Sequence, residues 1–300
     1  MLQELKNFIL HLRLHYQFFI LSGGYFLGGL MADQMQLSQF WWQFLNVHVL
    51  LYGGATAFNS YWDKDEGPIG GLKHPPKMTL WMHKVSLLLM AIGWIWALNV
   101  SWEYFVVYGI SMILFWLYST PLARWKGDPI LSLIAIGIST GLNSVFLGFW
   151  AAGGEFSLEI LLGGIGASLI LLSLYPVSQI YQADEDSKRG DVTFFIKFGQ
   201  QGVQRFFQST YLFGLMILCI GFYRIYSTPA IVLFIVGLLS FTIISGFVTA
   251  LKGDREEYQK VMNIKFFASI SFVIFLLISN IIRYEWLGRT FLSNYFSKKF

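Results

Sequence analysis

Charged residues are scarce in this 300-residue sequence, since Lys, Arg, Asp and Glu make up only 13% of it. Soluble domains carry about twice that fraction, and so few polar groups could not cover a water-exposed surface. Cysteine is rarer still: Cys219 stands alone, which excludes a disulfide scaffold. The 29 Phe, 15 Tyr and 11 Trp exclude a disordered chain. These observations leave a polytopic membrane protein.

Long apolar runs account for most of the chain. A helix needs about 20 residues to cross a bilayer, and nine runs of that order are present: 15–32, 41–60, 79–99, 102–119, 129–151, 158–181, 206–223, 228–250 and 262–282. Their apolar residues do not alternate in units of about 10 residues, as strands of a membrane barrel would. We therefore predict an all-α protein with nine transmembrane helices and one domain, residues 1–300.

The basic residues predict the orientation. With the N-terminus in the cytoplasm, 16 of the 21 Lys and Arg residues lie on the cytoplasmic side, as the positive-inside rule requires. The other side receives Arg224, Arg283, Arg289, Lys298 and Lys299. Because the net charge of +4 follows from this topology, it does not indicate a nucleic-acid partner. We expect an integral multi-pass protein of a bacterial plasma membrane.

Seven of the 17 acids lie in two short stretches at the ends of the second and sixth predicted helices, both on the cytoplasmic side. The first stretch runs from Asn59 to Gly67 and the second from Gln182 to Asp191. Clustered acids beside a bilayer need counter-charge. Because they come with no His or Cys cluster, the hard cation Mg²⁺ is the expected ligand, together with substrate phosphate.

Polar residues also recur on one face of each of these two helices, at i, i+4, i+7 and i+11. The second helix presents Tyr52, Thr56, Asn59 and Asp63, and the sixth presents Tyr175, Gln179, Gln182 and Asp186. The two sets are offset by a constant 123 residues. The offset indicates a weak internal repeat, in which two half-bundles present polar stripes to a central cavity. Inter-helix polar contacts would explain the spacing equally well.

Basic residues flank both acidic stretches. They are Lys73 and Lys77 after the first, Arg124 and Lys126 after the fourth helix, and Lys188 and Arg189 within the second. A diphosphate site requires acids that bind Mg²⁺ and, beside them, Lys and Arg residues that bind the diphosphate oxygens.

These motifs resemble those of the UbiA superfamily of intramembrane prenyltransferases, whose two aspartate-rich motifs follow helices two and six of nine. The first family motif, Asn-x3-Asp-x3-Asp, matches at Asn59 and Asp63 and departs at Gly67, with Asp65 and Glu66 nearby. The second, Asp-x3-Asp followed by Gly and Thr, matches at Asp186, Gly190 and Thr193 and departs at Gln182. The family's Tyr-Ser-x-Pro-x-x-Arg-x-Lys pattern runs from Tyr118 to Lys126, and Arg13 resembles its N-terminal basic residue.

The resemblance implies Mg²⁺-dependent transfer of a prenyl group from a prenyl diphosphate to a lipophilic acceptor, most commonly an aromatic quinone precursor. The implied metal ligands are Asn59, Asp63, Asp65, Asp184 and Asp186. The implied catalytic residues are Asp63, Asp184, Asp186 and Gln182. The implied substrate-binding residues are Arg13, Tyr52, Lys73, Tyr118, Arg124, Lys126, Tyr175, Lys188 and Arg189. The oligomeric state stays open.

Two alternatives remain at this point. Polar stripes inside the membrane and repeated halves are also typical of transporters, although the charges lie at helix ends rather than near the midplane. The departures at Gly67 and Gln182 each remove a carboxylate from the family pattern, so a catalytically impaired, prenyl-lipid-binding homologue is the second alternative.

Overall fold

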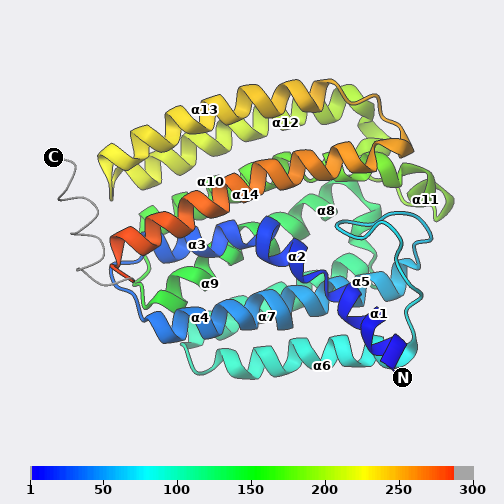
Figure 1. The fold of residues 1–300 in the computed structure, drawn as a ribbon, viewed down its shortest axis with the longest axis horizontal. Helices are drawn as coiled ribbons and strands as arrows, with labels where there is room; N and C mark the ends of the chain where they lie inside the picture. The colour runs from blue at the N-terminus through cyan, green and yellow to red at the C-terminus, as the bar shows by residue number, and fades with distance from the viewer. Residues whose placement is uncertain (1, 287–300) are drawn as a thin grey trace.

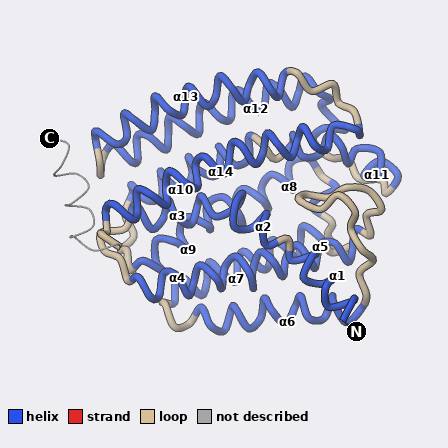
Figure 2. Tube along the Cα trace, viewed as in Figure 1, coloured by secondary structure: helices blue, strands red, loops and turns tan. Residues whose placement is uncertain are grey.

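The computed structural model describes residues 2–286, and over that range the chain is a bundle of helices joined by loops (Figures 1 and 2). The short helix α1 (Leu2–Leu12) precedes nine helical spans in these residues. The prediction of an all-α fold with nine spans is therefore confirmed. Arg289, Lys298 and Lys299 lie outside the described residues.

Five spans consist of one α-helix each: α6 (Leu80–Ala97), α7 (Trp102–Ser119), α12 (Phe194–Tyr223), α13 (Ser227–Thr249) and α14 (Tyr258–Arg283). The first span joins α2 (Leu14–Tyr16) to α3 (Ser22–Met31), and the second joins α4 (Leu37–Leu45) to α5 (Gly54–Asp63). The fifth joins α8 (Pro129–Ile136) to α9 (Asn143–Ala152), and the sixth joins α10 (Leu158–Ser173) to α11 (Ala183–Lys188).

Among residues 2–286, six spans qualify as membrane-crossing helices by their length and apolar composition alone. The other three, which contain α3, α4 with α5, and α7, carry amides, histidines and tyrosines instead. Many of these polar groups are buried and paired: Asn46 donates to the Gly93 carbonyl at 3.0 Å and accepts from the Tyr108 hydroxyl at 3.1 Å. Polar contacts between helices thus replace part of the apolar surface.

Three spans contain a wider π-helical segment in the middle: Gln17–Leu21, Asn46–Gly53 and Gly137–Leu142. Such segments are rare and frequently mark functional sites. Here they carry Tyr52 and Thr140, which line the central cavity described below.

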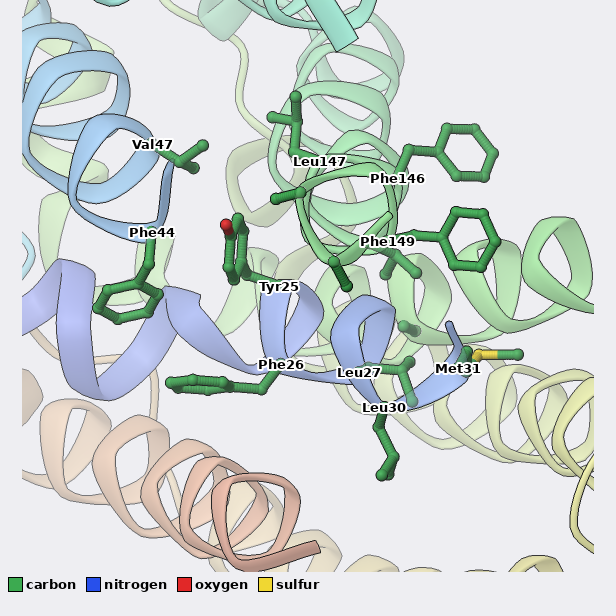
Figure 3. Close-up of a cluster of buried hydrophobic side chains, with 14 of the residues drawn as sticks. Tyr25, Phe26, Leu27, Leu30, Met31, Phe44, Val47, Phe146, Leu147 and Phe149 are labelled. Carbon is green, nitrogen blue, oxygen red and sulfur yellow. The ribbon is translucent and has the colours of Figure 1, made fainter. Parts of the chain in front are cut away.

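Two glycines allow α3 and α9 to pack with their backbones in contact. A Cβ built on Gly28 would overlap the Val145 carbonyl oxygen, and one built on Gly148 would overlap the Tyr25 carbonyl oxygen. The aromatic and aliphatic side chains around this crossing form the largest buried cluster (Figure 3). Close approach through small residues is the usual way for helices to associate in a bilayer.

The sixth span differs from the continuous helix expected over 158–181. The α-helix ends at Ser173, and the chain continues as a 3₁₀ helix over Pro176–Gln182. Pro176 lacks an N–H and cannot extend the α-helical ladder. A 3₁₀ helix repeats every three residues, so Tyr175, Ser178 and Tyr181 line the cavity, whereas Gln179 does not.

Candidate functional site

A cavity of about 340 Å³ lies inside the bundle, and both acidic stretches lie at one end of it. α1, α11 and the last turn of α5 lie at that end, which is on the right in Figure 1. Nine of the site residues implied by the family resemblance line the cavity: Arg13, Tyr52, Asn59, Asp63, Asp65, Tyr118, Lys126, Tyr175 and Gln182. Most of the remaining lining is apolar, from α10, α12, α13 and α14.

Asp63, the last residue of α5, forms a buried ion pair with Lys126 from the loop between α7 and α8. The Lys126 Nζ lies 2.6 Å from Asp63 Oδ2, and both side chains are buried. The second oxygen, Oδ1, is buried with no hydrogen-bond partner among the described residues, and Arg124 Nη2 lies 3.7 Å away. Burial lowers the pKa of Lys126, but Asp63, Asp186 and Asp65 outweigh it and raise the pKa above its usual value.

Arg189, directly after α11, joins the two acidic stretches. Its Nη1 lies 2.6 Å from Asp65 Oδ1 in the first stretch, and its Nη2 lies 2.5 Å from Asp186 Oδ1 in the second. Its Nε lies 3.5 Å from Asp191 Oδ2. One guanidinium thus contacts three carboxylates, from two stretches that lie more than 120 residues apart in sequence.

Asp191 accepts two parallel hydrogen bonds from Arg124, at 2.7 Å from Nε and 2.8 Å from Nη2. Such bidentate pairs fix geometry as well as charge. Burial raises the pKa of Asp191, but the hydrogen bonds from Arg124 and the charges of Lys126, Arg124 and Arg189 lower it below its usual value. Arg124 is thus held over the Asp63 carboxylate.

We call these seven residues the loop-bridging cluster: Asp63, Asp65, Arg124, Lys126, Asp186, Arg189 and Asp191. Its four carboxylates exceed its three cations by one charge. A further contact between the two stretches comes from Gly67, whose backbone N–H donates to Glu185 Oε1 at 2.7 Å. The position that departs from the family motif at Gly67 thus contributes its backbone to the junction.

The donor set of the cluster fits a hard divalent cation. Asn59, Asp63 and Asp65 offer oxygens into the same cavity, one Asp63 oxygen is without a partner, and the cluster carries an excess negative charge. Among the residues that the structure describes, no three His, Cys, Asp or Glu side chains already converge as a metal cage. Mg²⁺ does not require such a cage, because it retains waters and binds one or two carboxylates plus substrate phosphate.

Tyrosines line the cavity next to the cluster. The Tyr118 and Tyr175 hydroxyls lie 2.9 Å apart, which joins the fourth and sixth spans. Asn59 donates to Ser119 Oγ at 3.1 Å, and the buried Tyr52 hydroxyl lies 3.5 Å from the Ser139 carbonyl oxygen. Electron-rich rings therefore surround the space between the charged end and the apolar end.

Three residues singled out from the sequence lie elsewhere. Lys73, Asp184 and Lys188 are exposed and do not line the cavity. Asp184 and Lys188 share one face of α11, while Asp186 lies on the buried side. Arg124 and Arg189 do not line the cavity, but they pair with Asp63 and Asp65, which do. Asp186 is connected to the cavity only through Arg189.

Sequence reasoning gave no role to Asp191, Tyr16 or Lys265, all of which belong to this region. Asp191 belongs to the second acidic stretch, so the sequence shows its charge, but the sequence does not show that Arg124 is its partner. Lys265 lies in α14 and lines the cavity together with Tyr16.

The comparisons with known proteins agree with this geometry. Residues 18–271 match the UbiA prenyltransferase family, so the chain belongs to that family. The class expected from the sequence, a prenyltransferase embedded in the membrane by multiple spans, is confirmed. No protein of curated function matches the sequence.

Solved structures show the same fold. A UbiA homologue from Archaeoglobus fulgidus bound to GPP and Mg²⁺ superposes with a TM-score of 0.71 at 14% identity, covering 91% of this chain and 99% of the other. The same values hold for that homologue bound to DMAPP and Mg²⁺. A digeranylgeranylglyceryl phosphate synthase structure gives a TM-score of 0.59 at 18% identity, covering 91% and 99% of the two chains.

Proposed function

We propose that this protein transfers a prenyl group from a prenyl diphosphate to a lipophilic acceptor, with Mg²⁺ as cofactor and one domain over residues 1–300. The loop-bridging cluster carries the proposal, because it gathers acids and cations at one end of an otherwise apolar cavity. The Archaeoglobus homologue, which has the same fold, was solved with GPP and Mg²⁺. A transporter would need its charged groups near the membrane midplane rather than at helix ends.

Asn59, Asp63 and Asp65 would hold Mg²⁺, which supplies charge neutralisation for the departing diphosphate. Lys126 is the residue best placed to bind diphosphate oxygens. Its ammonium has three N–H donors, of which only one is engaged, by Asp63, among the described residues. The side chain also lines the cavity.

Arg124 and Arg189 fill a different role, because most of their donors are engaged by Asp191, Asp65 and Asp186. They hold the two acidic stretches together. Of the guanidinium nitrogens of these two arginines, only Arg124 Nη1 makes no contact with the described residues of the cluster, so its donors remain for a ligand oxygen.

Cleavage of the allylic C–O bond leaves positive charge on the prenyl carbon and negative charge on the diphosphate. The rings of Tyr52, Tyr118 and Tyr175 line the adjacent space and stabilise the allylic cation through cation–π attraction. Apolar side chains from α12, α13 and α14 exclude water and accommodate the isoprenoid chain. Gln182 lines the same space and would orient the acceptor.

We further propose that the acceptor is an aromatic quinone precursor and that the N-terminus and both acidic stretches face the cytoplasm of a bacterial cell. The excess of Lys and Arg on that side supports this orientation.

The test is a reconstitution. Purified protein with Mg²⁺ and labelled geranyl diphosphate should bind the donor, and diphosphate should be released when an acceptor is added. Asp63→Asn and Asp186→Asn should each abolish turnover while the fold persists. Asp128→Asn is the matched control, because Asp128 caps α8 through the Ile130 and Leu131 N–H groups and Asn caps equally well. Absence of Mg²⁺-dependent donor binding would contradict the proposal, whereas binding without turnover of any acceptor would favour the impaired homologue.

A further inference from the structure

The two acidic stretches differ in whether their carboxylates already have partners. In the first stretch, the Asp63 oxygen Oδ1 is buried without a hydrogen-bond partner among the described residues. Asn59, Asp63 and Asp65 all line the cavity. Because a buried carboxylate oxygen without a partner is costly, the first stretch has an open position for a cation.

In the second stretch, the buried carboxylates are paired with arginines. Asp186 is 3% exposed and Asp191 is 4% exposed. Arg189 Nη2 lies 2.5 Å from Asp186 Oδ1, and Arg124 donates two hydrogen bonds to Asp191. The protein's own cations therefore compensate the charge of these two acids.

The second stretch also presents no carboxylate to the cavity. Of residues 182–191, all of which the structure describes, only Gln182 lines the cavity, and its amide carries no charge. Asp184 is exposed, and Glu185 accepts a hydrogen bond from the Gly67 N–H at 2.7 Å. A divalent cation in the cavity would thus take its charged oxygen ligands from the first stretch rather than the second.

Arg189 occupies the place of a cation that joins the two stretches. Its Nη1 lies 2.6 Å from Asp65 Oδ1 and also donates to the Asp63 carbonyl oxygen at 3.4 Å, while its Nη2 contacts Asp186. Burial lowers the pKa of Arg189, but Asp65, Asp63 and Asp186 raise it above its usual value, so the guanidinium stays charged. Unlike a metal ion, this cation is covalently attached and cannot dissociate.

The two departures from the family pattern agree with this arrangement. Gly67 and Gln182 each stand where the pattern has an acid, so the chain offers two negative charges fewer to metal ions. That difference equals the charge of one Mg²⁺. The chain therefore lacks carboxylates at the same junction where Arg189 supplies a positive charge.

We propose that this protein binds its prenyl diphosphate with one Mg²⁺ at the first acidic stretch, and that Arg189 serves as the fixed cation of the second. The inference rests on the proposed prenyl transfer and specifies its metal stoichiometry. Asn59, Asp63 and Asp65 supply oxygens to the single ion, which also binds water and diphosphate. Arg189 is a positioning residue, because it holds Asp65 and Asp186 together.

The experiment counts metal ions on the full-length protein in lipid nanodiscs. Mn²⁺ replaces Mg²⁺ because the free ion has a strong EPR signal that is lost on binding. Geranyl thiolodiphosphate replaces the donor because its C–S bond resists cleavage, and empty nanodiscs with the same compound give the background. We expect one Mn²⁺ per chain and a donor affinity that rises with the first power of the free Mn²⁺ concentration. Two ions per chain, or a dependence on the second power, would overturn the proposal.

Gln182→Asp combined with Arg189→Gln restores the carboxylate of the family pattern and removes the fixed cation. This double variant should bind two Mn²⁺ per chain, and a count that stays at one would contradict the role of Arg189. Arg189→Lys keeps the positive charge and should still bind one ion. Arg205→Gln makes the same chemical change at an exposed arginine of α12 and is the matched control, for which one ion is expected.

If the double variant does not fold, the count in the unmodified protein decides the question alone. Failure of the proposed function is a different result, namely no Mn²⁺-dependent binding of geranyl thiolodiphosphate by the unmodified protein. A count of two ions with intact donor binding would leave prenyl transfer standing and would remove only the assignment of Arg189.

Discussion

Asp191→Asn tests whether the loop-bridging cluster depends on an acid that is not a matched position of either family motif. In the cluster, Asp191 accepts two hydrogen bonds from Arg124. An asparagine keeps one oxygen that can accept a hydrogen bond from Arg124. Its amide NH₂ replaces the other oxygen, so that an N–H donor faces the second guanidinium donor and that hydrogen bond is lost. A charge-assisted hydrogen bond contributes about 1.5–3 kcal/mol, and Arg124 is only 23% exposed, so most of that value should be lost.

The expected destabilisation is thus about 1.5–3 kcal/mol, which corresponds to a fall in Tm of roughly 3–6 °C for a chain of this size. Donor affinity should also fall about 3- to 10-fold, because Arg124 and Arg189 lose their common acceptor and a small misplacement of catalytic groups reduces binding and rate. Thermal unfolding in nanodiscs and equilibrium binding of geranyl diphosphate measure the two effects.

A double-mutant cycle with Arg124→Gln separates this contact from others. If Asp191 acts through Arg124, the coupling should be about 1.5–3 kcal/mol, and Asp128→Asn should leave Tm and affinity unchanged. The reasoning is refuted if Asp191→Asn matches the unmodified protein in both measurements, or if the two substitutions are additive.

Three further predictions concern other parts of the molecule. Gly148→Ala forces a methyl group into the Tyr25 backbone and should destabilise the bundle by about 1–3 kcal/mol in thermal unfolding, whereas Gly246→Ala, with no atom within 4 Å, should not. Burial lowers the pKa of His11 to about 4, although its bond to the Pro76 carbonyl acts in the opposite direction. The folded protein therefore favours the neutral ring. The stabilisation of the fold by the neutral ring is complete above pH 6.5 and is lost as the pH falls toward 4. Hydrogen exchange in residues 66–79 should rise over that interval, and His11→Gln should remove the dependence. The acids of the cluster are already paired with cations, so Mg²⁺ alone should raise Tm only slightly. Mg²⁺ together with geranyl diphosphate should raise Tm much more, and EDTA should abolish this increase.

Most of the fold could be predicted from the sequence, because the length and spacing of apolar runs determine which segments can cross a bilayer. The spans begin and end within a few residues of the expected positions, except where Pro176 converts the end of the sixth span to a 3₁₀ helix and where α12 begins at Phe194 rather than near 206. Both exceptions lie at the charged end, where hydropathy no longer specifies the backbone.

The charges of the site could be predicted, but their partners could not. Asp184 and Asp186 are two residues apart, yet α11 turns one outward and the other into the cluster. Lys188 follows Asp184 to the exposed face. Lys265 adjoins Tyr16 only because α14 packs beside the first span, a relation that no local pattern records.

The cluster also constrains the order in which the protein can be completed during synthesis. Asp63 leaves the ribosome 63 residues before its partner Lys126, and Asp65 precedes Arg189 by 124 residues. Until those cations arrive, the first acidic stretch has no reason to leave water, and it stays in the aqueous layer while four more spans insert. Closure of the charged end is therefore complete only after the sixth span has been synthesised, because Arg189 follows that span and contacts Asp65.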